Sequence, residues 1–147
     1  MAITVAAYGL GILDTLEAPR DWEAVTMKLA LATSSYTPNR DTHDFWDDVS
    51  ANELANGSGY TTGGATLANV ATSYDSASDE VRLDFDDVSW TFTASKTWRY
   101  GVIYIDTAGA SSTDPVLLLL TWDSDQSVST AYTLQINAAG IFAIDTT

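Results

Sequence analysis

The chain has 147 residues, of which 20 are Asp or Glu and six are Lys or Arg, so its formal net charge is −14. So few cations argue against a nucleic-acid partner or an anionic membrane, because each phosphate contact requires a positive charge. The chain contains no cysteine, which excludes disulfides and thiolate metal sites. Its hydrophobic content of 46% is high enough for a folded core, and the length predicts a single domain over residues 1–147.

The first 20 residues predict an apolar N-terminal arm that leads into a short helix. Residues 3–13 are almost wholly apolar, but no basic residue precedes them, so a signal peptide is not favoured over a buried first element or a docking arm. Leucines recur at helical spacing between Gly9 and Glu17, and Pro19 marks the end of the helix. The side chains that we expect this helix to bury are Leu10, Ile12, Leu13 and Leu16.

Residues 25–147 predict a β-rich body. Apolar residues alternate with polar ones in short runs that are separated by turn residues. The expected strands cover residues 27–31, 65–74, 80–85, 88–92, 98–105, 116–122, 130–136 and 141–144, and the last two form a closing hairpin. The run at 98–105 is apolar on both sides, which is typical of a central strand. We therefore expect a mostly β, single-domain antiparallel β-sandwich or barrel, with Trp90, Trp98 and Trp122 in its core.

A long acidic-aromatic loop follows the first strand of this body, over residues 33–50. We expect a helical turn at residues 43–49, capped by Asp41 or Thr42. The loop carboxylates are weak candidate ligands for a hard cation such as calcium, which binds six to eight oxygens. These candidates are Asp41, Asp44, Asp47 and Asp48. The fixed ligand spacing of a calcium loop is missing, so a solvated acidic loop is favoured and no metal or other cofactor is expected.

No sequence motif predicts an enzyme. His43 is the only histidine, and no Gly-x-Ser-x-Gly elbow accompanies it, so a hydrolase that uses His43 is the least favoured hypothesis. Residues 57–64 are glycine-rich, but the Gly-Lys-Ser/Thr of a phosphate-binding loop does not follow them. We interpret this segment as a loop that requires positive φ angles.

Four aromatic side chains within these polar segments are candidates for partner contact. They are Tyr36, Phe45, Trp46 and Tyr60. Large aromatic side chains in a polar loop either anchor that loop on the body or meet a partner. We favour the anchor for the loop aromatics and keep the partner contact as the alternative.

A series of motifs runs in a fixed order through residues 29–75. They are Leu-Ala-Thr-Ser-Ser-Tyr-Thr-Pro-Asn at 31–39, Asp-Thr-His-Asp at 41–44, Asn-Glu at 52–53, Gly-Ser-Gly-Tyr-Thr-Thr-Gly-Gly at 57–64 and Leu-Ala-Asn at 67–69. In this order they resemble small structural proteins of tailed bacteriophages. The resemblance carries no catalytic residue.

The resemblance implies a virion component that is assembled in the host cytoplasm, most simply a capsid decoration (cement) or head-fibre-like protein. Its expected partners are the major capsid protein or other virion subunits, and a homo-oligomer, favoured as a trimer, would suit a three-fold site on the capsid. The alternative is a host-recognition or carbohydrate-binding module of a tail fibre or baseplate, with Trp46 and Tyr60 as its loop aromatics.

Overall fold

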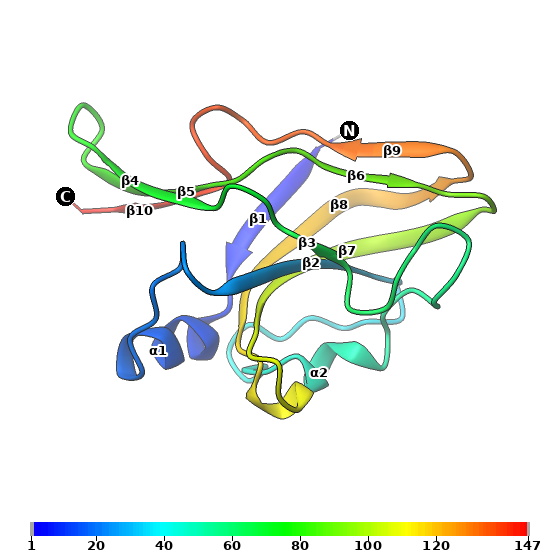
Figure 1. Cartoon of the computed structure of the whole chain (residues 1–147), viewed down its shortest axis with the longest axis horizontal. Helices are drawn as coiled ribbons and strands as arrows, with labels where there is room; N and C mark the ends of the chain where they lie inside the picture. Colours follow the sequence, from blue (N-terminus) through cyan, green and yellow to red (C-terminus); the bar gives the residue numbers. More distant parts are fainter. Residues whose placement is uncertain (1, 147) are drawn as a thin grey trace.

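The computed structural model describes residues 2–146, which are mostly β and form several antiparallel sheets that do not close into a barrel. The barrel alternative is therefore excluded. The largest sheet has five strands in the order β1-β8-β7-β2-β3 (Figure 1). Their bounds are β1 (Ile3–Ala7), β8 (Val116–Val128), β7 (Lys96–Asp106), β2 (Thr26–Ala32) and β3 (Ala65–Thr66).

Two smaller sheets lie on one side of the five-stranded sheet, and the helices lie on the other side (Figure 1). The three-stranded sheet has the order β10 (Phe142–Asp145), β5 (Glu80–Asp84) and β4 (Ala71–Asp75). The two-stranded sheet pairs β6 (Val88–Thr91) with β9 (Ala131–Leu134). The helices are α1 (Gly9–Glu17), α2 (Asp47–Ser50) and the 3₁₀ helix η1 (Ser111–Thr113). No helix of residues 2–146 is long and apolar enough to cross a membrane.

The five-stranded sheet is buried on both faces. Leu29 lies opposite Ile103, which lies opposite Leu118, and this row belongs to a first core cluster that faces the two small sheets. The adjacent residues of β2 and β7, Ala30 and Val102, belong to a second core cluster on the opposite face. Side chains of neighbouring strand residues point to opposite faces, so an apolar run is buried on both. The prediction of a central strand at 98–105 is confirmed.

The three predicted core tryptophans are buried in the first core cluster. The rings of Trp98 and Trp122 meet edge to face, with centroids 6.2 Å apart. This is a favourable geometry for aromatic pairs. The prediction for Trp90, Trp98 and Trp122 is therefore confirmed.

Three local predictions are wrong. The expected strand at 65–74 is two strands in different sheets, because β3 pairs with β2 while β4 pairs with β5. The expected closing hairpin does not form, because β9 pairs with β6 and β10 with β5, and the Ile136 N–H donates to Asp87 Oδ1 at 2.7 Å. The helical turn begins at Asp47 after Trp46, without a side-chain cap, so neither Asp41 nor Thr42 caps it.

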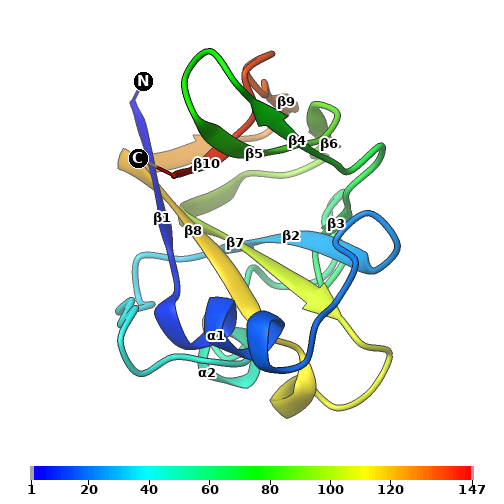
Figure 2. The same cartoon turned by 90° about the vertical axis from the view of Figure 1, so that its left-hand side faces the viewer.

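The apolar N-terminal segment is part of the largest sheet. β1 pairs antiparallel with β8 and forms one edge of that sheet, and α1 follows it directly. Figure 2 shows β1 descending along β8 to α1, which lies at the lower end of the molecule. The helix predicted at 9–17 is confirmed with its bounds.

Candidate functional site

The acidic-aromatic loop folds back against the second face of the five-stranded sheet. Tyr36, Trp46 and Val49 are buried in the second core cluster. The indole of Trp46 stacks on the Tyr104 ring with centroids 4.5 Å apart and an interplanar angle of 7°. The Trp46 N–H donates to the Asp114 carbonyl at 2.9 Å. The interpretation of the loop aromatics as anchors is therefore confirmed for Tyr36 and Trp46.

This burial decides which aromatic candidates a partner can reach. Tyr36, Trp46 and Tyr60 are buried, so their rings offer no surface to a partner while the loops hold this conformation. Phe45 is half-buried and lies at the surface between Asp44 and Trp46. Of the four candidates for partner contact, Phe45 is the one that the fold leaves accessible.

A chain of hydrogen bonds joins Tyr8, Tyr36 and His43. The two phenol oxygens are 2.9 Å apart, and the Tyr36 oxygen is 2.7 Å from His43 Nδ1. The Asn39 N–H also donates to Nδ1, at 3.4 Å, so this nitrogen is an acceptor. Tyr36 therefore donates to His43, and Tyr8 donates to Tyr36. Burial raises the pKa of Tyr36 to about 12 and also raises the pKa of Tyr8, so both phenols remain neutral donors.

The surroundings of His43 do not form a nucleophilic site. Within residues 2–146, Nδ1 of His43 accepts hydrogen bonds from the Tyr36 hydroxyl and the Asn39 N–H, and the ring hydrogen-bonds to no serine or carboxylate. A triad needs a nucleophile and an orienting acid on the two sides of the imidazole. In this structure the hydrogen bonds among Tyr8, Tyr36 and His43 instead connect the start of α1 to the acidic-aromatic loop.

The four acidic candidates are not brought together into a cation site. Asp41, Asp47 and Asp48 are exposed and Asp44 is half-buried. Asp48 Oδ2 accepts the Asp44 N–H at 3.0 Å. Partial burial raises the pKa of Asp44, and the charge of Asp48 adds to this effect. No group of three or more metal-ligating side chains occurs within residues 2–146.

The glycine-rich loop closes over the edge of the large sheet. Four of its glycines have positive φ angles, which confirms the predicted backbone. Glu53 Oε1 accepts the Tyr60 hydroxyl at 2.8 Å and the Gly63 N–H at 2.6 Å. The Tyr104 hydroxyl donates to the Gly63 carbonyl at 2.8 Å. Burial raises the pKa of Glu53. Its two hydrogen bonds tie the glycine-rich loop to residue 53.

The leucines of α1 lie on the surface, contrary to the prediction. Leu10, Leu13 and Leu16 are 38%, 44% and 71% exposed, while the helix buries Gly11 and Thr15. A Cβ on Gly11 would lie 1.6 Å from the Val116 carbonyl oxygen. The helix therefore contacts β8 through Gly11, and Ile12 packs half-buried against the first core cluster, while its three leucines face outward. The prediction of buried side chains is therefore wrong for Leu10, Leu13 and Leu16, whereas Ile12 does pack against the core.

A second apolar row crosses the three-stranded sheet. Tyr74 lies opposite Val81, which lies opposite Ile144, and their exposed fractions are 58%, 41% and 47%. Val81 shares its face with Leu83, as the alternation predicted, but only Leu83 is buried. The sheet extends beyond the body, so the outer end of this face meets solvent.

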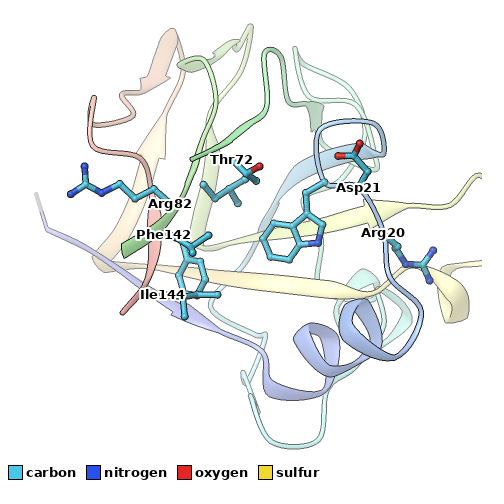
Figure 3. A pocket seen from close by; sticks show the side chains of 9 residues that line it. Arg20, Asp21, Thr72, Arg82, Phe142 and Ile144 are labelled. Atoms are coloured by element: carbon cyan, nitrogen blue, oxygen red, sulfur yellow. The ribbon is translucent and has the colours of Figure 1, made fainter. Parts of the chain in front are cut away.

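An apolar groove of about 330 Å³ lies between this sheet and residues 20–22 (Figure 3). Its apolar lining is Trp22, Val81, Leu83, Phe142 and Ile144. In Figure 3, Phe142 and Ile144 face the groove, whereas the guanidinium groups of Arg20 and Arg82 point away from it. Arg20 pairs with Asp14, and Arg82 pairs with carboxylates of its own sheet. The rim therefore presents no unpaired arginine to a ligand.

Comparisons of the chain with protein-family models, with curated proteins and with solved structures find no match.

Proposed function

We propose that this chain is a structural protein of a tailed-phage virion, which attaches to the outer capsid surface as a decoration (cement) protein. It acts without catalysis and binds the major capsid protein or a neighbouring subunit. Three copies associate around a three-fold position. The motif series at 29–75 supports this proposal.

The observation that carries the proposal is the distribution of exposed apolar side chains. Within residues 2–146, the exposed large hydrophobic side chains come from α1 and from the three-stranded sheet. Both elements lie toward the viewer in Figure 2, on one side of the molecule. Exposed apolar side chains that gather in patches mark interaction sites in soluble proteins, and each of the two elements presents such side chains. This side is the face that we assign to the capsid and to neighbouring copies.

A compact body suits this role, and we describe it as β-sandwich-like. The five-stranded sheet forms one layer, the two small sheets form the other, and the first core cluster lies between them. The acidic-aromatic loop covers the other face of the five-stranded sheet. A cement protein needs a body that holds its contact surface rigid, and burial of the loop aromatics supplies this rigidity.

The aromatic side chains that suggested the alternative, a host-recognition module, are not accessible to a sugar. A sugar stacks on an exposed aromatic face, and Trp46 and Tyr60 are buried. Tyr74 on the three-stranded sheet is the exposed aromatic side chain that remains for such a role.

Co-sedimentation tests the proposal. Particles of the phage that encodes the chain, stripped of it, are mixed with the purified protein and pelleted, and intact tails that lack heads serve as the control. We expect saturable binding to heads. The number of bound copies of the chain on each capsid face should be a multiple of three. Binding to tails alone, or to neither preparation, would refute the capsid assignment.

A further inference from the structure

The outward face of α1 combines leucines with carboxylates. At about 100° per residue, the helix divides into an inward arc and an outward arc. The inward arc carries Gly11, Ile12 and Thr15. The outward arc carries Leu10, Leu13, Asp14, Leu16 and Glu17. The apolar and acidic side chains therefore share one surface.

The seating of the helix fixes this orientation. Gly11 packs against the backbone of β8 at Val116, where no side chain can be accommodated. The preceding Tyr8 is fully buried, and its N–H donates to the Leu117 carbonyl at 2.9 Å. The Gly9 N–H donates to the Arg40 carbonyl at 3.1 Å. Rotation that turned the leucines inward would break these contacts, so the outward face is a built feature of the fold.

A groove of about 200 Å³ runs beside the helix and extends this surface to the acidic-aromatic loop. It is lined by Leu10, Leu13, Asp14, Glu17, Asp44 and Phe45. Asp14 pairs with Arg20 at 3.1 Å. Within residues 2–146, no ion pair engages Glu17 or Asp44. The groove therefore offers apolar surface together with two carboxylates that lack a cation.

We propose that this surface, formed by the outward face of α1 with Asp44 and Phe45, docks an amphipathic basic segment of a protein partner. The apolar side chains of the segment pack on the leucines and Phe45, and its Lys or Arg side chains pair with Glu17 and Asp44. The inference rests on the proposed function in one respect, namely that the segment belongs to a virion subunit.

Charge selects this occupant over a second copy of the chain. An isologous contact between two α1 faces would place carboxylates against carboxylates in a protein whose net charge is −14. A basic segment reverses that repulsion and supplies apolar side chains to the same groove. The α1 face therefore contacts the partner, and contacts between copies use other surfaces.

Fluorescence anisotropy with designed peptides tests the chemistry. The probe is a fluorescein-labelled peptide of about 14 residues with Leu and Lys at helical spacing, and a Leu/Glu peptide of the same pattern is its control. The doubly substituted Leu13→Ser/Leu16→Ser chain and the Glu17→Lys chain remove the apolar and the acidic contacts. Val81→Ser/Ile144→Ser, on the three-stranded sheet, is the matched control.

We expect the Leu/Lys peptide to bind, and each of the two α1 variants to raise its Kd at least about tenfold, because one variant loses apolar contact area and the other reverses the charge that faces the lysines. The Val81→Ser/Ile144→Ser chain should bind as the unsubstituted chain does. Equal affinity for the Leu/Glu peptide, or unchanged affinity of the α1 variants, would overturn the inference. Self-association through α1 without peptide binding would overturn it as well.

Co-sedimentation with stripped heads separates this inference from the proposed function. If the Leu13→Ser/Leu16→Ser chain binds heads as tightly as the unsubstituted chain, the α1 surface is not the docking site, and the capsid role stands. If the peptide results hold and no chain binds heads, the surface chemistry is supported and the capsid role fails.

Discussion

Replacement of Gly11 by alanine tests the packing that turns the leucines of α1 outward. The added Cβ would lie 1.6 Å from the Val116 carbonyl oxygen and 2.7 Å from its carbonyl carbon. Both atoms belong to the backbone of β8, which is paired on both sides within the five-stranded sheet. The overlap cannot be relieved by a side-chain rotation, so the helix itself must move.

The expected cost follows from two opposing effects. Overpacking of a buried contact costs about 1–3 kcal/mol, and the rigid backbone neighbour places Gly11→Ala at the upper end. Alanine also favours the helix by about 1 kcal/mol relative to glycine, which offsets part of this cost. The net loss is about 2 kcal/mol, which lowers the Tm of a chain of this size by about 4–8 °C.

Gly9→Ala is the matched control, because its nearest neighbour is the Arg40 carbonyl oxygen at 3.7 Å, an ordinary contact. Its stability should stay within about 0.5 kcal/mol of the unsubstituted chain. Thermal and urea unfolding followed by circular dichroism measure both variants. Equal stability of Gly11→Ala and Gly9→Ala would refute the seating of α1 on β8, and with it the outward leucine face.

Three further predictions concern stability. Tyr36→Phe should lower the free energy of unfolding, measured in urea, by about 1–3 kcal/mol, because the buried Tyr8 hydroxyl loses its hydrogen-bond partner. Tyr74→Phe, at an exposed site, should lower it by less than about 0.5 kcal/mol, and equal losses would contradict the hydrogen bonds that join Tyr8, Tyr36 and His43. Burial raises the pKa of Glu53, so the folded state favours its protonated form; this contribution is complete below about pH 4 and declines as pH rises through the folded pKa. Between about pH 4 and about pH 7, the free energy of unfolding should therefore decline less for Glu53→Gln than for the unsubstituted chain. Parallel curves for the two chains would contradict the effect of burial on Glu53. Leu16→Ser should change the free energy of unfolding by less than about 0.5 kcal/mol, and a loss above about 2 would show that Leu16 is buried.

The sequence predicted those elements whose pattern depends on local alternation. Apolar residues on both sides of 98–105 indicated a strand buried on both faces, and β7 is that strand. The leucine spacing at 10, 13 and 16 located α1 to the residue. In both cases the period of the side chains alone determines the element.

Predictions failed where a non-local backbone contact decides the outcome. Periodicity assumes that the apolar face of a helix is the buried face, whereas the approach of Gly11 to Val116 turns the three leucines of α1 to the surface. The expected closing hairpin failed because β9 and β10 each find a partner far away in the sequence, in β6 and β5. Pairing between distant strands leaves no local signal.

The candidate site was predictable only as a set of residue types. The aromatic side chains in a polar loop indicated anchors, and Tyr36 and Trp46 are anchors. The hydrogen bond between Tyr8 and Tyr36 joins residues that lie 28 positions apart, so no sequence motif predicts it. The outward leucines carry no separate signal either, because a buried and an exposed leucine stripe have the same spacing.

Cryo-electron microscopy of heads saturated with the purified chain tests the capsid role most directly. The proposal predicts density for the chain on the outer capsid surface, around three-fold positions, with α1 toward the capsid protein. Density on the tail alone would contradict the capsid role, whereas density on the capsid with α1 facing solvent would contradict only the docking of α1.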